Sequence, residues 1–400
     1  MSGAPFNIKR LFFRPAHTDS VYPGFSPFAP LSAERIDAAR QKHGEVVDQY
    51  LRYLHMGDPL ADALVEHFET LPAGEGWKLL NRAIEEGIEA LQDPPPQLTA
   101  LFAELDHVPF WVDWERMRLG SAKICKNGVL VAVTFAGYAL PYAYLAPANV
   151  PLVFTGELLD AAAHRYARTA RFVIETFFPD GLRRDADGFK WAVMIRITHA
   201  SARRRLLQSG TWDAARFGAP LNQAHNAMNT VFFSFYLLQG MRKLGVRFTP
   251  QEAESILLIW RYVGHLFGID PELVYTSEEE AHRLVTVALS LEFDPDENTK
   301  KLCRTMLAAG ASFMGINNPR LERWFIDLVI ASSRHLLGDD LANRMGFPQA
   351  KHRLLCRAII LWIRCSEWLP FLMPPALRRY MGISFWLQAG EYETTPLRPN

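Results

Sequence analysis

Phe189–Leu207, FKWAVMIRITHASARRRLL, contains no glycine or proline and is predicted to form one long helix. His199 lies near its centre, with Arg196 three residues before it and Arg203 four residues after it. At 3.6 residues per turn, these three side chains share one face of the helix. The other flank is apolar, with Trp191, Met194, Ile195 and Ile197. A histidine between two cations on a largely buried helix is therefore the first candidate site.

Two interpretations of His199 are open from this helix alone. A neutral imidazole is a good ligand for haem iron, and guanidinium groups pair with carboxylates such as the haem propionates. The alternative is a satisfied core histidine beside a solvated basic patch formed by Arg203, Arg204 and Arg205. The helix by itself favours the second interpretation, so the rest of the chain has to decide between them.

The composition is that of an ordinary globular protein. The chain has 400 residues, of which 49% are hydrophobic and 22% charged, and 43 Lys and Arg balance 43 Asp and Glu. A net charge of zero disfavours nucleic acid or an anionic membrane as the main partner, because both require a basic surface. The 10 Trp and 26 Phe are expected to surround a large apolar interior or an apolar cavity.

Cysteine usage and the N-terminal sequence indicate the compartment. The four cysteines are widely spread: Cys125, Cys303, Cys356 and Cys365. No Cys-x-x-Cys occurs, which disfavours a zinc site or redox pair, and no Cys-x-x-Cys-His occurs for covalent haem attachment. Free thiols in a reducing compartment are expected. Residues 1–20 lack the apolar segment and cleavage site of a secretory signal, so we expect a cytoplasmic protein.

Gly128–Ala146, GVLVAVTFAGYALPYAYLA, is uncharged over a length that would span a membrane. Pro141, two glycines and three tyrosines disfavour a spanning helix. We expect a buried core helix, and peripheral contact with a membrane stays open.

Helical patterns dominate the chain and alternating β-branched runs are scarce, so the predicted fold is all-α. Thr249-Pro250-Gln251-Glu252 predicts a helix start with a capping box. Residues 1–30 are expected to form an extended arm, 31–390 a single domain and 391–400 a loose tail. Further helices are expected over Leu31–His55, Pro59–Leu71, Trp77–Leu91, Gln97–Leu105, Pro109–Lys126, Gly156–Phe178, Leu221–Leu244, Thr276–Leu291, Glu297–Ala311, Pro319–Leu337 and Gln349–Leu369.

A second candidate site lies in the predicted helix Gly156–Phe178. Arg165, Arg168 and Thr169 follow each other at helical spacing and line one face. Two guanidinium groups and a hydroxyl beside an apolar pocket could bind a carboxylate or hydrogen-bond to oxygen on a metal. A solvated basic stripe is the alternative, and the spacing alone favours it.

Two further histidines could act as ligands. His225 lies in a helix start crowded with amides, Asn222, Gln223 and Asn226, where a surface histidine is favoured. His265 lies near the end of the helix that begins at Thr249, where a structural role at the helix terminus is favoured.

Other catalytic patterns are weak or absent from the sequence. Glu104…His107 and Glu279…His282 have the Glu-x-x-His spacing of di-iron bundles, but one ends a helix and the other begins one. There is no His-Glu-x-x-His, Gly-x-Ser-x-Gly, phosphate-binding glycine loop or dinucleotide fingerprint. Hydrolases and nucleotide-dependent enzymes are therefore disfavoured.

Five ordered pieces of the sequence resemble the family of MpaB-type oxygenases and latex-clearing rubber oxygenases. They lie within roughly residues 100–300, and although each is short, their order and spacing together are specific. The pieces are Thr155-Gly156-Glu157-Leu158, Arg165-x-x-Arg168-Thr169, Arg196-Ile-Thr198-His199-Ala200, Gly218-Ala-Pro220-Leu-Asn222-Gln223 and Trp260-Arg261-x-x-Gly264-His265-x-x-Gly268-Ile269.

The resemblance implies a large helical domain with a globin-like core around one haem b. It makes His199 the proximal iron ligand, and it places Arg165 and Thr169 where they would polarise dioxygen or position the substrate. Arg196 and Arg203 would anchor the propionates on the proximal side. This family-based expectation reverses the preference for a core histidine at position 199.

Two positions depart from the family pattern. Arg168 stands where the rubber oxygenases have a distal lysine, and a guanidinium stays protonated, so it would bind a propionate or substrate carboxylate rather than iron. The family's upstream glutamate has no clear counterpart: Asn149 is near its spacing and Glu157 is the nearest carboxylate. The predicted function is therefore a haem-b oxygenase that uses O₂ on an apolar, alkene-containing small molecule, with rubber itself not implied. The alternatives are a haem-binding sensor and a metal-free helical protein that binds a lipid-like ligand.

Overall fold

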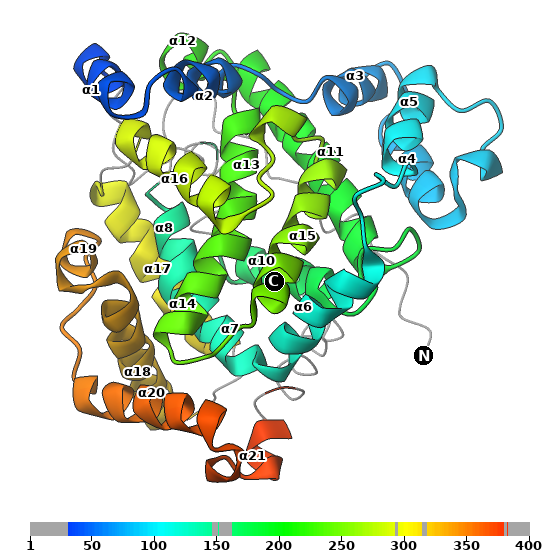
Figure 1. The fold of residues 1–400 in the computed structure, drawn as a ribbon. Helices are drawn as coiled ribbons and strands as arrows, with labels where there is room; N and C mark the ends of the chain where they lie inside the picture. Colours follow the sequence, from blue (N-terminus) through cyan, green and yellow to red (C-terminus); the bar gives the residue numbers. More distant parts are fainter. Residues whose placement is uncertain are drawn as a thin grey trace.

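The computed structural model describes residues 31–145, 151, 162–292, 295–313, 318–379 and 382. Every regular element in these ranges is a helix, which confirms the predicted all-α fold (Figure 1). The expected arm 1–30, the expected tail 391–400 and the piece Thr155–Leu158 with Asn149 lie outside the described residues. The predicted division of the chain therefore stays a prediction.

The N-terminal helices form two groups at the edge of the molecule (Figure 1). The first two helices pack on each other, and α3 packs on α4 and α5. Asp58 caps α3 by accepting a hydrogen bond from the Ala61 backbone N–H at 3.2 Å, with Pro59 in the first turn. The bounds are α1 Ala33–His43, α2 Val46–Leu54, α3 Pro59–Phe68, α4 Glu75–Glu86, η2 Ile88–Ala90 and α5 Pro96–Leu105.

The central helices contain both candidate sites. α15 packs along α6, while α10 packs against α11 and α17 (Figure 1). The predicted capping box at Thr249 and Glu252 is confirmed at the start of α15. The bounds are α6 Trp114–Lys126, α7 Gly128–Thr134, η3 Phe135–Ala139, α8 Leu140–Ala143, α10 Ala162–Phe177, α11 Asp187–Gln208, α12 Ala214–Phe217, α13 Gln223–Val231, η5 Phe232–Tyr236, α14 Leu237–Lys243 and α15 Pro250–Leu266.

The C-terminal helices cover one side of the central ones and end at the lower edge in Figure 1. α17 packs on α10 and α18, and α18 packs on α19 and α20. The bounds are η6 Pro271–Leu273, α16 Glu278–Glu292, α17 Glu297–Phe313, α18 Pro319–Leu337, α19 Asp339–Arg344, α20 Arg353–Trp368, η7 Pro370–Leu372 and α21 Pro375–Arg379.

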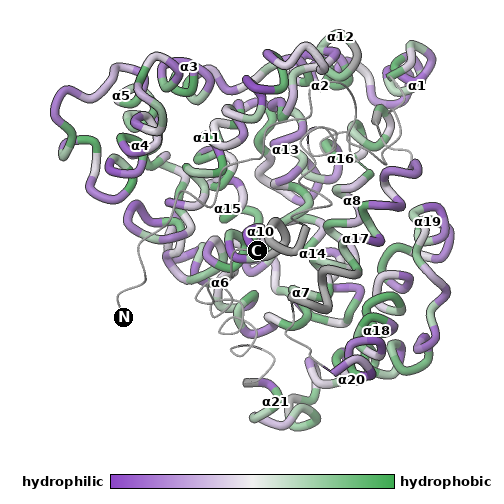
Figure 2. Tube along the Cα trace, turned by 180° about the vertical axis from the view of Figure 1, so that it is seen from behind, coloured by the Kyte–Doolittle hydropathy of each residue, from purple (hydrophilic) through white to green (hydrophobic). Residues whose placement is uncertain are grey.

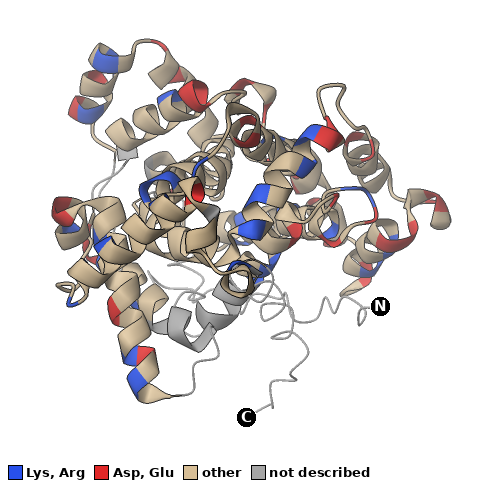
Figure 3. Ribbon diagram, turned by 60° about the horizontal axis from the view of Figure 1, so that its bottom comes forward, with Lys and Arg blue, Asp and Glu red and all other residues tan. Residues whose placement is uncertain are grey.

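One connected core of buried apolar side chains runs through these helices. Hydrophobic and hydrophilic residues are interspersed along most of them (Figure 2). The largest fully buried side chains of the core include Trp260, Tyr262, Phe177 and Phe189, from α10, α11 and α15. Positive and negative side chains alternate over the surface (Figure 3). Large buried side chains are therefore present where the two candidate helices meet.

Several predicted helices are interrupted in the structure. Trp77–Leu91 is broken at Gly87, which has a φ of 91°, and Leu221–Leu244 contains a π-turn over Phe232–Tyr236. Leu31–His55 is not one helix, because Gly44 adopts a φ of 70°, which ends α1 and lets α2 begin at Val46. The described part of the predicted helix Gly128–Ala146, residues 128–145, is mostly buried, as expected, but it includes a π-turn over Phe135–Ala139. The Leu140 N–H donates to the Phe135 carbonyl five residues back, directly before Pro141, which has no N–H.

The described part of the chain contains no single helix that is long and apolar enough to cross a membrane. The pair Trp114–Lys126 and Gly128–Ala143 meets that test together by length and composition, but it is bent by 85°. All four cysteines are free thiols, as predicted, and burial raises the pKa of Cys125 to about 11.

Candidate functional site

His199 lies near the middle of α11, a helix whose buried side chains come from all around it. The imidazole is half-buried and meets the ring of Phe267 edge-on, with ring centroids 6.2 Å apart. Burial lowers the pKa of His199 to about 4, and the charge of Arg203 acts in the same direction. His199 is therefore a neutral imidazole at pH 7, which is the form that binds a metal.

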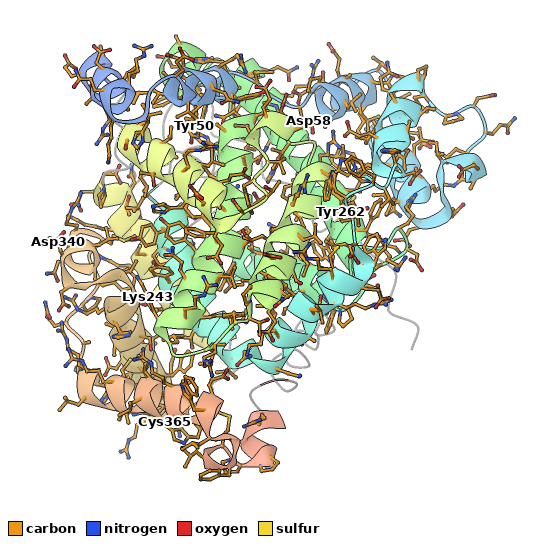
Figure 4. All side chains as sticks on the ribbon, in the orientation of Figure 1. Tyr50, Asp58, Lys243, Tyr262, Asp340 and Cys365 are labelled. Atoms are coloured by element: carbon orange, nitrogen blue, oxygen red, sulfur yellow. The ribbon has the colours of Figure 1, made fainter. Side chains whose placement is uncertain are left out.

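Arg196 is buried and is fully engaged with carboxylates of the protein. Its Nε and Nη2 pair with the Asp58 carboxylate at 2.6 and 3.0 Å, and its Nη1 donates to Glu104 Oε1 at 2.7 Å. Asp58 lies at the start of α3, labelled in Figure 4, and is itself only 4% exposed. Arg196 thereby joins α11 to the ends of α3 and α5.

Arg203 has the same kind of environment one turn beyond His199. Its Nε and Nη2 contact Asp62 Oδ1 at 2.9 and 2.6 Å, and its Nη1 donates to the Leu221 carbonyl at 2.7 Å. Both guanidinium groups thus neutralise carboxylates of the protein's own N-terminal helices. The expectation that Arg196 and Arg203 anchor propionates stays a prediction.

Gln223 connects the loops around this pair of arginines. Its Nε2 donates to the carbonyls of Gly57 at 3.0 Å and Gly268 at 2.8 Å, and its Oε1 accepts from the Asp270 N–H at 3.0 Å. Gly268, which follows α15 with a φ of 65°, lies against the Arg196 guanidinium so closely that a Cβ would overlap it. The network fixes α11 relative to α3, α13 and α15.

Asn226 stands beside His199 and is buried. Its Nδ2 donates to the Leu221 carbonyl at 3.2 Å, which fixes the direction of the amide. Its Oδ1 is buried and makes no full hydrogen bond, while the side chain raises the pKa of His199 against the larger effect of burial. The amide oxygen is thus a buried acceptor without a partner in the neighbourhood of the imidazole.

The α10 face approaches His199 through aromatic rings. Phe172 stacks on Phe267 at 5.7 Å, and Phe267 in turn contacts His199. Thr169 lies three residues before Phe172, and Arg165 four residues before Thr169, so all three share one helical face. Arg168 and Thr169 are half-buried, whereas the side chain of Arg165 lies outside the described part of the structure. The two candidate sites of the sequence therefore face a common aromatic layer.

The other histidines have structural contacts. His225 is buried, not at the surface as the sequence suggested, and its Nδ1 lies 3.1 Å from Asn222 Nδ2 at the start of α13. His265 Nε2 contacts the His107 carbonyl at 3.2 Å, and burial lowers the pKa of His265. The histidine at the end of α15 thus has the structural role that was favoured.

The Glu-x-x-His pairs do not form a metal centre. Glu104 is bound to Arg196, and His107 is exposed. Glu279 and His282 are exposed on α16. Within the described ranges, no three His, Cys, Asp or Glu side chains come together as a metal site. The di-iron alternative therefore has no support in this part of the chain.

A surface cavity of about 590 Å³ lies on another side of α15, between α6 and the start of α16. Its wall includes Trp111, Arg116, Glu254, Leu257 and Arg261. None of the predicted site residues lines it. The cavity is separate from the aromatic layer that joins α10 to His199.

This all-helical fold is shared with a family of oxygenase domains. The family model described as "ER-bound oxygenase mpaB/B′/Rubber oxygenase, catalytic domain" matches residues 128–365, more than half of the chain. The chain belongs to this family. The match extends beyond the 100–300 region that the sequence pieces indicated.

The fold is also similar to a solved structure, latex clearing protein in the closed state. The two share 19% sequence identity, with a TM-score of 0.67 over 84% of this chain and 90% of that one. At this identity the likeness concerns the fold alone. No curated protein matches the chain.

Several important residues were not identified from the sequence. Asp58 and Asp62 pair with arginines more than a hundred residues away, and no local pattern predicts such pairs. Asp58 directly precedes the predicted helix Pro59–Leu71, but the sequence does not show that it pairs with Arg196. Asn226 was noted as one of several amides, but its position beside His199 depends on how α13 packs.

Proposed function

We propose that this chain is a haem-b-dependent oxygenase that uses O₂ on an apolar, alkene-containing substrate of isoprenoid or lipid-like character. The observation that carries the proposal is His199: a neutral imidazole in an oxygenase-family domain, whose ring contacts Phe267 in the aromatic layer that includes Phe172 of α10. The family supports an oxidoreductase, and the haem and the substrate class are our inference.

The residues around His199 fit a haem better than a metal held by side chains alone. A porphyrin supplies four nitrogen ligands, so the protein needs to provide one axial imidazole and not a cluster. A ligating histidine usually donates its second N–H to a neighbouring acceptor, which fixes the tautomer, and Asn226 Oδ1 is such an unsatisfied acceptor. The buried Trp260 Nε1 is a second polar atom without a partner among the described residues.

Each described residue then has a role. His199 holds the iron, and Asn226 orients the imidazole. A bound haem supplies the redox-active iron that makes dioxygen reactive towards an alkene. Thr169 offers a hydroxyl and Arg168 a permanent cation near the reacting groups, where they position oxygen or a substrate carboxylate. Arg165, on the same helical face, is proposed for the same purpose from its position in the sequence.

The aromatic layer explains why an apolar substrate is proposed. Phe172, Phe267, Trp260 and Phe233 form a chain of ring contacts with centroids 5.0 to 5.9 Å apart. Such a surface binds hydrocarbon and excludes water, and it offers few hydrogen bonds to a polar substrate. Isoprenoids and unsaturated fatty acids have the apolar, alkene-containing chains that such aromatic rings would bind.

A visible spectrum of the purified protein tests haem ligation. We expect an intense Soret band that is lost in His199→Ala and kept in His265→Gln, the matched control for a histidine outside the proposed site. Asn226→Leu should retain haem but shift the band and weaken retention by about 10- to 100-fold. A protein that stays colourless after incubation with haem would contradict the proposal.

Oxygen consumption then separates the oxygenase from a haem sensor. Uptake of dioxygen with an isoprenoid or an unsaturated fatty acid is expected, and it should fall in Thr169→Ala and Arg165→Ala while the Soret band persists. Haem binding without any uptake would favour the sensor. We also propose a cytoplasmic location, which cell fractionation tests.

A further inference from the structure

Exposed apolar side chains gather on the C-terminal helices. Of the fourteen large apolar residues that are exposed in the described ranges, nine lie in α18, α20, η7, α21 and the turn between them. Leu354 is 81% and Phe371 78% exposed, whereas large apolar side chains elsewhere are mostly buried. We call the surface formed by Leu354, Leu361, Trp368, Phe371 and Leu377 the C-terminal apolar face; it lies along the lower edge in Figures 1 and 2.

The helix α20 is apolar on two opposite sides. Cys356, Ile360 and Ile363 are buried and pack into the protein against α18 and its neighbours. Leu354, Leu361 and Trp368 follow at intervals of seven residues, which aligns them on one exposed stripe. A surface helix of a water-soluble domain has one apolar side, so the second apolar side has to be explained.

The same segment is strongly basic in a chain whose overall charge is zero. Residues 341–379 contain seven Lys and Arg and a single acidic residue, Glu367. Glu367 is already bound, because its Oε2 accepts from Lys123 Nζ at 3.4 Å and from the Arg247 N–H at 3.3 Å. Two of the seven cations also have partners, because Arg353 pairs with Asp339 at 2.7 Å and Lys351 with Asp327 at 3.3 Å. The cations of α20 that remain without an acidic partner among the described residues are Arg357 and Arg364.

Two of these cations lie within the exposed stripe itself. Arg357 and Arg364 come three residues after Leu354 and Leu361, so arginine and leucine alternate along the helix. Both arginines are exposed, and neither forms an ion pair or hydrogen bond with another described residue. Their guanidinium groups are free to bind external anions.

We propose that the C-terminal apolar face docks on the surface of an anionic phospholipid bilayer, with α20 parallel to the membrane plane. The leucines and aromatic rings enter the boundary of the acyl chains, and Arg357 and Arg364 contact the phosphates of the headgroups. Arginines on the face of an amphipathic helix favour anionic lipids, which are concentrated on cytoplasmic membrane leaflets. A hydrophobic substrate could then be taken up from the membrane.

The alternation of arginine and leucine along α20 argues against two other partners for this face, a second copy of the chain and a nucleic acid. In a two-fold dimer through α20, each copy would present the same arginines to its partner, and the like charges would repel. Nucleic acid would contact the arginines but would leave the leucines and Phe371 exposed to water. A bilayer satisfies both kinds of side chain at once.

Co-sedimentation of the full-length protein with vesicles tests this inference. We expect binding to phosphatidylcholine vesicles that contain phosphatidylserine, much weaker binding to phosphatidylcholine alone, and weakening by salt. Leu361→Asp combined with Phe371→Asp should reduce the partition coefficient at least about tenfold. Phe110→Asp is the matched control, because Phe110 is 99% exposed next to α6 and away from α20; it should bind as the wild type does.

Arg357→Glu combined with Arg364→Glu should remove the preference for phosphatidylserine. All substituted side chains are exposed, so circular dichroism should show the same helix content and melting in each variant. Equal binding by the wild type and the double-aspartate variant would overturn the proposal. So would dimers that form through this face without any vesicle binding, or equal binding to neutral and anionic vesicles. Sedimentation does not require haem, so this inference and the proposed function fail independently.

Discussion

At the scale of single residues, the pKa of His199 depends on burial and on how the charges next to the imidazole are neutralised. Arg203 lowers the pKa of His199, while Asp58, the partner of Arg196, raises it. Because each arginine is bound to a carboxylate at or near the start of α3, the imidazole does not face two free cations. Burial is the larger effect, and it keeps the histidine neutral.

This shift predicts how stability depends on pH in the haem-free protein. The pKa is 6.5 for an ordinary histidine and about 4 for His199 in the folded state, so between these values the unfolded chain binds more protons. The free energy of unfolding should therefore fall as the pH decreases, by about 2 kcal/mol between pH 7 and pH 5. Urea unfolding at both pH values measures it.

His199→Gln is the control for this dependence, because it removes the titrating group at similar size. The loss of stability between the two pH values should be smaller in the variant than in the wild type by about 2 kcal/mol. Equal pH dependence in both proteins would show that His199 does not have a lowered pKa.

The second prediction at this scale concerns the buried ion pair between Arg196 and Asp58. Arg196→Ala leaves Asp58 buried without a counter-charge and should cost about 3–5 kcal/mol in the free energy of unfolding. Arg204→Ala is the matched control, since its partner Glu69 is exposed, and it should cost less than about 1 kcal/mol. If both variants were equally stable and only Arg196→Ala lost haem, the result would contradict the structural role of Arg196 and favour the propionate role expected from the sequence.

At the scale of elements, the site is held by helix ends. The start of α3, the end of α5 and the end of α15 all meet Arg196 on the side of α11. Helix termini have backbone groups without partners inside the helix, so they readily accept such contacts. The interior of α11 is thereby fixed by three chain segments that are distant in sequence.

Gly268 tests this arrangement. A side chain at this position would need a φ of 65° and would overlap the Arg196 guanidinium. Gly338 is a suitable control, because it also follows a helix with a positive φ of 84°, but a Cβ added there would meet nothing within 4 Å. Gly338→Ala should cost about 1 kcal/mol from backbone strain. Gly268→Ala should cost about 1–3 kcal/mol more, measured by urea unfolding. Equal losses of stability in the two variants would mean that the Arg196 side chain moves away from the new Cβ without cost.

At the scale of the whole molecule, the proposed haem would lie within the shared core and so be linked to folding. A ligand that binds only the folded state stabilises it, by about 2.7 kcal/mol at a hundredfold excess over its Kd. Thermal unfolding with and without haem should show this gain in the wild type and in His265→Gln. His199→Ala should not show it, and a gain of the same size there would exclude His199 as the ligand.

The helices were predicted well because their signals are local. Pro319–Leu337 was predicted with the bounds that α18 has, and the capping box of α15 is present. The breaks at Gly44 and Gly87 and the π-turns over Phe135–Ala139 and Phe232–Tyr236 were missed. A glycine is compatible with helix interior or helix end, and the hydropathy pattern of a buried segment does not distinguish α from π geometry.

The sequence by itself determined the all-α class, many of the helix boundaries and the choice of His199, because periodicity, caps and the order of short motifs are written in neighbouring residues. Only the tertiary structure decided what Arg196 and Arg203 do, since their partners Asp58 and Asp62 lie more than a hundred residues away. It also placed Asn226 beside the imidazole and exposed a second apolar side on α20. Burial and the pairing of buried charges depend on which helices meet, and no local pattern specifies that.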